Sequence, residues 1–308
     1  MKLTQGPIAR GTIRTSFVLG LRLVVQAGTL LIVARMLGPH EFGAFAGIAA
    51  LAVILGTLST FGMHLILVGE VSRDPLRRDA VLRYAIPWTL LCGSVLFGIY
   101  LLICVTALRE AAVGVQVLLL LGITETLLQP LIILGASEHH GLGRVARSQL
   151  LAVLPLSLRL AAAATVFGLG LHDPLVAYAY GYGCASLLGF AVVLFTLPAF
   201  WPGPGRWRLP AWTQLREAFS YAVINITKAG PAELDKTLAT KLLALDAAGL
   251  YAAGARVIGA ITLPITAMMV SSLPRLFREG QAKPERTGRL LRWMFSVAAG
   301  YSIVLAGV

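Results

Sequence analysis

Apolar stretches of about 20 residues, separated by short polar segments, recur along most of the chain. A helix of that length crosses the hydrocarbon core of a bilayer, which is about 30 Å thick, and inside lipid a helix satisfies its own backbone. The pattern predicts eight spans and the start of a ninth near residue 290. The eight lie at 12–37, 43–68, 84–107, 111–136, 148–170, 174–198, 217–243 and 248–274. We therefore expect an all-α polytopic membrane protein.

The segment after the first predicted span recurs after the seventh. Residues 35–46, RMLGPHEFGAFA, align without a gap with residues 241–252, KLLALDAAGLYA, at an offset of 206 that pairs Gly43 with Gly249. An even number of crossings separates the two copies, so both enter the membrane in the same direction, as in transporters built from two parallel repeats.

This repeat predicts two lobes. A six-helix lobe is expected at 1–198, a linker rich in proline and glycine at 199–216, and part of a second lobe at 217–308. Two complete lobes would contain twelve helices, of which about nine are expected here. On this reading the chain is truncated inside its second repeat.

The distribution of charge indicates how the chain is oriented. Hydrophobic residues make up 57% of the chain and charged residues 13%, against roughly 25% charged in soluble domains. Of the basic residues near the span ends, eighteen fall in one set of loops and only Arg35, Arg109 and Lys241 on the other side. This asymmetry places the amino terminus in the cytoplasm.

In a soluble protein, a net charge of +12 would suggest nucleic acid as a partner. The cations are spread over five separate loops without a stacking platform, so nucleic-acid binding has no support.

Nothing in the sequence indicates an enzyme. No phosphate loop is present, and Gly141-Leu142-Gly143 lacks the strand that a dinucleotide fingerprint requires. His139 and His140, next to Glu138, are expected to form a solvated turn on an inside loop, because no second ligand cluster accompanies them. The three cysteines fall within apolar spans, where they are expected to pack. We therefore expect no catalytic residue, no metal site and no cofactor.

Charged and polar side chains inside the predicted spans are the candidates for function. A charge in lipid costs about 2.5 to 3.5 kcal/mol on insertion scales unless it faces a cavity or a partner. The candidates for a substrate path are Arg22, Gln26, Arg159, Asn225, Lys228, Lys236 and Arg256. The candidates for ion coupling are Glu125, Glu233 and Asp235.

Two of these cations correspond under the repeat, since Arg22 plus 206 is Lys228. Arg22 shares a helix face with Gln26, and Lys228 shares one with Asn225, so each lobe begins with a polar stripe that is expected to face the other lobe. Two structural alternatives stay open. Arg22 can extend toward the interface, and Glu233 and Lys236, three residues apart, can neutralise each other.

Two regions carry a resemblance to a known family. They are Leu37-Gly38-Pro39-His40-Glu41-Phe42-Gly43-Ala44-Phe45 and the stretch from Asp235-Lys236 through Gly249-Leu250-Tyr251 and Leu263-Pro264-Ile265 to Leu273-Pro274-Arg275-Leu276. In these motifs and in its layout, the chain resembles the polysaccharide transporter family of the MOP exporter superfamily, the Wzx-type flippases of O-antigen and other lipid-linked oligosaccharides.

The resemblance implies two facing lobes that work by alternating access in a bacterial inner membrane. It implies flipping of an undecaprenyl-pyrophosphate-linked oligosaccharide from the inner to the outer leaflet, for surface polysaccharide and lipopolysaccharide synthesis. Membrane lipids, a polysaccharide polymerase and a chain-length regulator are the further partners it suggests. The alternatives are a MATE-like drug or cation antiporter of the same superfamily and an inactive truncated membrane protein.

Overall fold

The computed structural model describes the backbone of residues 7–108, 113–261 and 284–306, together with residues 265, 269 and 272. Throughout these residues the secondary structure is helical, without a strand, which confirms the expected all-α class.

The first helix, α1 (Pro7–Ser59), contains the first two predicted spans up to residue 59. It bends at Gly38, whose φ of 70° and ψ of 171° belong to a backbone region that is essentially restricted to glycine. Pro39 follows, and its fixed φ suits the first turn of a new helix. The prediction of one uninterrupted span at 43–68 is wrong, because the helix ends at Ser59 and resumes as α2 (Met63–Arg73).

The remaining elements cover the other predicted spans. They are η1 (Pro75–Arg77), α3 (Arg78–Thr106), α4 (Val115–Ile123), η3 (Thr124–Leu128), α5 (Gln129–Gly141), α6 (Val145–Leu169), α7 (Pro174–Thr196), η4 (Pro204–Arg206), α8 (Trp212–Leu242), α9 (Leu245–Ile261) and α11 (Pro284–Ala306). Because η3 is a π-helical turn, α4, η3 and α5 form one continuous run. Residues 262–264, in the eighth predicted span, lie outside the described residues.

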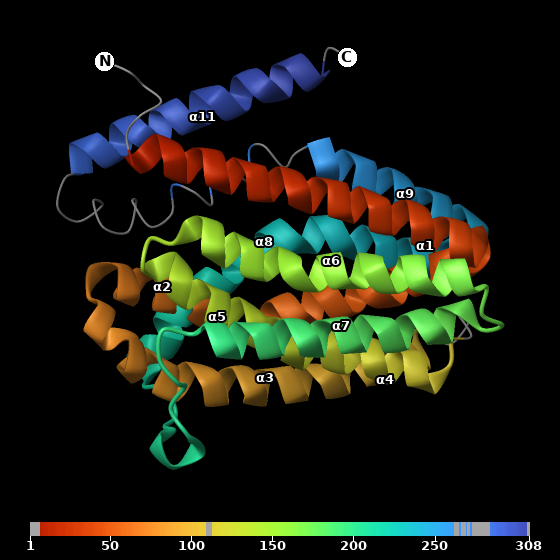
Figure 1. Cartoon of the computed structure of the whole chain (residues 1–308), viewed down its shortest axis with the longest axis horizontal. Helices are drawn as coiled ribbons and strands as arrows, with labels where there is room; N and C mark the ends of the chain where they lie inside the picture. Colours follow the sequence, from red (N-terminus) through yellow and green to blue (C-terminus); the bar gives the residue numbers. More distant parts are fainter. Residues whose placement is uncertain are drawn as a thin grey trace.

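Five described helical segments are long and apolar enough to cross a membrane: Gly20–Ser59, Pro75–Thr106, Val115–Gly141, Val145–Leu169 and Pro174–Thr196. Figure 1 shows the helices α1 to α9 lying side by side, with their connections gathered at two ends. We name these the Gly38 end, where α1 bends, and the linker end, where the segment 197–211 joins α7 to α8.

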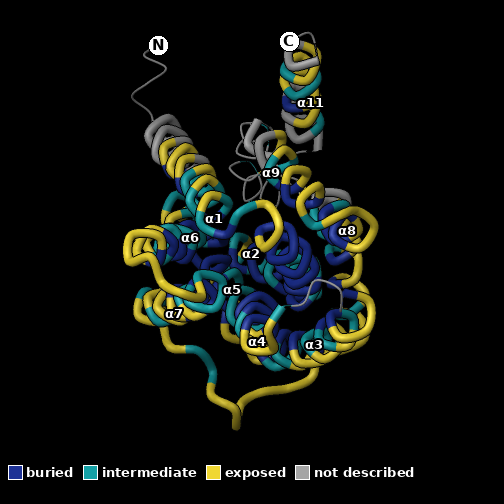
Figure 2. Tube along the Cα trace, turned by 90° about the vertical axis from the view of Figure 1, so that its right-hand side faces the viewer, coloured by how far each residue is buried: buried dark blue, intermediate teal, exposed yellow. Residues whose placement is uncertain are grey.

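The buried residues lie between the helices, and the outer faces are exposed (Figure 2). Tyr100, Tyr178 and Ile48 are among the most buried side chains. Large apolar side chains such as Phe195 and Leu102 are exposed on the outside, as expected for a surface that contacts lipid rather than water.

At the linker end, a buried ion pair joins α3 to α5 and to the start of the linker. Arg78, at the start of α3, donates from Nε to Glu138 of α5 and from Nη2 to the carbonyl oxygen of Ala199 at 2.6 Å. Glu138 also accepts a hydrogen bond from the indole of Trp201. The expectation of a solvated turn is therefore wrong, since Glu138 is buried in the last turns of α5.

The two neighbouring histidines, His139 and His140, are buried with it. The same polar residues that suggested an inside loop form instead the point where α3, α5 and the linker meet.

The helices α8 and α9 pack against α1. The two copies of the repeated segment break at corresponding positions, at Gly38 within α1 and at Leu243 and Ala244 between α8 and α9. Nearer the linker end, α8 also lies against Gly62, where an added Cβ would overlap its backbone. The division into lobes at 199–216 stays a prediction.

The two ends of the bundle are expected on opposite sides of the membrane, with the basic linker end in the cytoplasm. Arg208 is exposed at the linker end and His40 at the Gly38 end. In whole cells that express a variant without its native cysteines, an impermeant thiol reagent is expected to label His40→Cys but not Arg208→Cys. Both positions should react after permeabilisation. Labelling of Arg208→Cys alone in intact cells would show that the orientation is opposite to the predicted one.

Candidate functional site

Arg159 of α6 lies at the centre of a buried polar network. Its Nη2 is 2.9 Å from Glu125 Oε1, and its Nη1 donates to the hydroxyl of Tyr182 at 2.7 Å. The Tyr182 hydroxyl donates in turn to Glu125 Oε1 at 2.7 Å. Ser186 accepts from Nη2 at 2.8 Å, and Gln129 at 3.5 Å. An ion pair taken out of water is stable only when its remaining polar atoms are also hydrogen-bonded, and here every guanidinium nitrogen of Arg159 has a hydrogen-bond partner.

The position of Glu125 depends on an irregular piece of helix. It belongs to η3, and π-helical turns of this kind occur frequently at functional sites. A Cβ on Gly56 of α1 would overlap the carbonyl oxygen of Glu125, and one on Gly93 of α3 would overlap that of Thr126. The backbones of α1 and α3 therefore approach η3 from two sides and fix the place from which Glu125 reaches Arg159.

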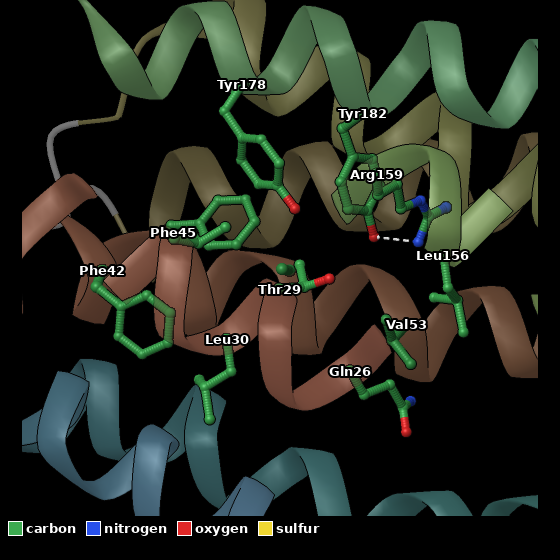
Figure 3. A pocket seen from close by; sticks show the side chains of 12 residues that line it. Gln26, Thr29, Leu30, Phe42, Phe45, Val53, Leu156, Arg159, Tyr178 and Tyr182 are labelled. Atoms are coloured by element: carbon green, nitrogen blue, oxygen red, sulfur yellow. Dashed lines mark hydrogen bonds between the residues drawn. The ribbon is translucent and has the colours of Figure 1, made fainter. Parts of the chain in front are cut away.

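Arg159 and Tyr182 also line a cleft between α1, α6 and α7 (Figure 3). Its lining consists of Gln26, Thr29, Leu30, Val33, Phe42, Phe45, Ala49, Val53, Leu156, Arg159, Tyr178 and Tyr182. Both halves of the bent α1 contribute, because the bend at Gly38 folds them against each other on one side of α6 and α7.

The cleft combines aromatic faces with a few polar groups. The rings of Phe45 and Tyr178 meet edge to face at 5.6 Å between centroids. Gln26, Thr29 and the guanidinium of Arg159 supply the polar part of the lining. Such a lining suits a ligand with an apolar or sugar-ring face and with oxygen atoms that accept hydrogen bonds.

Gln26 and Thr29 line this cleft together with residues of α6 and α7. That the polar stripe of the first helix faces the other lobe stays a prediction, as the division into lobes does. Residues of α1 after the bend, among them Gly43 and Gly47, contact α8 and α9.

Two predicted residues bury a hydrogen-bond donor that has no partner among the residues that the structure describes. They are Arg22 on α1, through Nε, and Asn225 on α8, through Nδ2. Arg22 precedes Gln26 by about one helical turn, toward the linker end. Buried donors are nearly always satisfied in folded proteins, and neither of these two residues lines the cleft.

The remaining predicted residues are paired or not described. Lys236 Nζ is 2.8 Å from Glu233 Oε2, which confirms the local neutralisation that the sequence left open. Asp235 accepts a hydrogen bond from the hydroxyl of Tyr251 at 2.8 Å. The side chains of Lys228 and Arg256 lie outside the described residues.

The sequence reasoning missed the polar residues of α7. Tyr178, Tyr182 and Ser186 are buried and follow one another at intervals of four, so they form one face of an otherwise apolar helix. That spacing is the signal from which they were predictable. Gln129 was missed as well, and only its place one turn after Glu125 relates it to the network.

Comparison with known proteins identifies the class. Three solved structures share the fold, each aligned over 96% of this chain and 70% of its own: a MOP superfamily transporter from Pyrococcus furiosus (TM-score 0.65, 17% identity), a MATE in the bent conformation (0.61, 18%) and a MATE in complex with MaL6 (0.59, 15%). The binding pocket of the first is described as having reverse polarity. The fold is therefore that of a MOP superfamily transporter.

A family model described as polysaccharide biosynthesis protein matches residues 8–279. The chain belongs to this family, and the resemblance drawn from its motifs is confirmed. No curated protein matches the sequence. The family and the shared fold are those of transporters rather than enzymes.

The Arg159 network yields a stability prediction. Removing either charge leaves the other buried without a partner, which costs about 3 to 5 kcal/mol for a buried pair. Arg159→Met and Glu125→Gln are each expected to lower the unfolding temperature of the purified protein in detergent. The double variant is expected to lose less than the sum of the two, because no charge is left unpaired.

The exposed Arg83 provides a matched control, and Arg83→Met is expected to leave the unfolding temperature unchanged. Strictly additive losses in the double variant would show that Arg159 and Glu125 do not depend on each other.

Proposed function

We propose that this protein translocates an undecaprenyl-pyrophosphate-linked oligosaccharide from the cytoplasmic to the outer leaflet of a bacterial inner membrane by alternating access. Membership of the polysaccharide biosynthesis family and the MOP transporter fold support a membrane transporter for a lipid-linked saccharide. The finer identification of the substrate depends on the polar groups of the interior.

The observation that carries the proposal is a surplus of buried donors. Arg22 Nε and Asn225 Nδ2 both donate and both have no partner within the described part of the chain, and they belong to helices that correspond under the repeat. A diphosphate offers oxygen atoms that only accept hydrogen bonds. A ligand of this kind complements both donors, whereas an organic cation complements neither.

The described carboxylates of the predicted path are already engaged. Glu125 is paired with Arg159 and Glu233 with Lys236, while Asp235 accepts from Tyr251. A cation carried through this interior would have to compete with a built-in partner at each of them. An anionic head group would bind to the donors of Arg22 and Asn225, for which no described residue competes.

The aromatic cleft suits the saccharide part of the same ligand. Tyr178 and Phe45 are buried and present only parts of their rings to the cleft, and Gln26 and Thr29 line it with groups that can hydrogen-bond to sugar hydroxyls. The prenyl chain needs no protein site, because it can stay in the hydrocarbon of the bilayer throughout.

A MATE-like cation antiporter is the second candidate, and Glu125 is the observation that favours it. A buried carboxylate next to a cleft is a group that a proton or a cation can neutralise. The two candidates predict different phenotypes. Expression of an antiporter raises resistance to cationic drugs, whereas a flippase restores surface polysaccharide.

Replacement of Arg22 tests the proposal. In a strain that lacks its own flippase, Arg22→Ala is expected to abolish or strongly reduce the surface polysaccharide that the parent protein restores. Arg22→Lys should keep part of the activity because the charge remains, and Arg22→Glu should be worse than alanine because it repels the phosphate.

The controls are membrane abundance, measured by immunoblot, and Arg83→Ala, which removes an exposed cation outside the interior. Restoration of normal polysaccharide by Arg22→Glu at normal abundance would exclude Arg22 from the transport path. Drug resistance without polysaccharide would favour the antiporter.

A further inference from the structure

At the Gly38 end, the backbones of α1 and α9 approach each other closely. A Cβ added to Gly43 would lie 3.0 Å from the amide nitrogen of Gly249 and would overlap the carbonyl oxygen of Leu245. A Cβ added to Gly249 would lie 3.3 Å from the amide nitrogen of Gly43 and would overlap the carbonyl oxygen of Pro39. The first turn of α9 therefore packs against Gly43, and the first turn of α1 after its bend packs against Gly249.

This contact follows the internal repeat. Gly43 and Gly249 are equivalent at the offset of 206, and so are Pro39 and Leu245. Equivalent residues therefore meet across the contact in both directions, as in an interface between two related copies of one structure. The contact is a property of the repeat rather than an incidental touch between neighbouring helices.

Two hydroxyl groups of α8 reinforce the contact. Thr240 donates to the carbonyl oxygen of Gly43 at 3.1 Å, and Thr237 donates to that of Gly47 at 3.2 Å. Each hydroxyl also lies near a carbonyl of its own helix, at 3.0 Å from Lys236 O for Thr240 and at 3.5 Å from Glu233 O for Thr237.

The shared hydroxyls make separation inexpensive. If α8 moves away from α1, each threonine keeps an acceptor four residues back in its own helix, as is common for threonine in membrane helices. The glycine carbonyls of α1 remain within a helix and keep their backbone partners. Separation therefore leaves no buried polar group unsatisfied, which is a requirement for a contact that opens inside a membrane.

We propose that these residues form a reversible latch, closed in this structure, which opens and closes the Gly38 end during transport. The latch consists of Gly43, Gly47, Thr237, Thr240 and Gly249. It extends the proposed function, since alternating access requires one end of the substrate path to close while the other opens. Ala252 of α9 is buried with core residues of α1 such as Phe42 and Phe45. The exposure of this position therefore indicates whether the latch is open.

The test uses the full chain in membranes that are open on both faces. In a variant without native cysteines, Ala252→Cys is labelled with a maleimide, and the rate reports how often α9 separates from α1. A Cβ at Gly47 would overlap the side chain of Thr240, so Gly47→Ala is expected to raise the rate about tenfold, equivalent to about 1.4 kcal/mol. Adding Thr240→Gly removes the overlapping atoms together with the hydroxyl, so the double variant should label more slowly than Gly47→Ala and at the rate of Thr240→Gly alone.

Gly20→Ala is the matched control, because it makes the same change in α1 with nothing within 4 Å of the new Cβ, and it should leave the rate unchanged. Thr240→Val keeps the side-chain shape and removes the hydroxyl, so it should raise the rate, whereas Thr240→Ser should not. The proposal is overturned if Gly47→Ala and Thr240→Val both label at the parent rate, or if Gly20→Ala raises the rate as much as Gly47→Ala.

The labelling requires no substrate, so the latch and the proposed function can fail separately. Accelerated labelling of Gly47→Ala, in a protein that restores no surface polysaccharide, would keep the latch and reject the proposed substrate. Restored polysaccharide with unchanged labelling would keep the proposed substrate and reject the latch.

Discussion

A guanidinium buried among membrane helices must be neutralised and fully hydrogen-bonded, and Arg159 meets both requirements through Glu125, Tyr182 and Ser186. Arg159 comes from α6, Glu125 from η3, and the other two residues from α7. The pair therefore fixes the relative positions of three segments far apart in the sequence. The close approach of α1 and α3 to η3 follows from the same need, since it sets the point from which Glu125 reaches its partner. The aromatic cleft forms where this network meets α1.

The bent helix α1 connects the two functional features. Its first half places Gln26 and Thr29 in the cleft, and its second half places Gly43 and Gly47 against α8 and α9. Phe45 lies between these two glycines in the sequence and lines the cleft. A movement of α8 and α9 against the second half of α1 would therefore be transmitted to the cleft through one rigid element. In the proposed function, this connection joins the state of the Gly38 end to the site where the substrate is held.

The apolar helices and the family were predictable because they depend on local signals: apolar length set by the bilayer, and motifs that lie in a repeat at a constant offset. Buried charges were recognisable one by one, but the pairing of Arg159 with Glu125, 34 residues away, depends on how η3 and α6 pack. Glu138 was assigned to a polar loop for the same reason. Its partner Arg78 lies 60 residues earlier in the sequence, and the contact depends on how α3 and α5 pack. Tyr182 and Ser186 gave no signal as single residues, because a tyrosine and a serine are ordinary in membrane helices, and only their spacing with Tyr178 marks a face.

The most direct measurement is translocation by the purified full chain in liposomes. A fluorescent prenyl-diphosphate saccharide is loaded into the inner leaflet, and its appearance in the outer leaflet is followed with a membrane-impermeant quencher, with protein-free liposomes as the baseline. The account predicts transfer above the baseline that is lost in Arg22→Glu and unchanged in Arg83→Ala. Transfer at the baseline rate, in liposomes where the same protein exchanges an organic cation for protons or sodium, would contradict it.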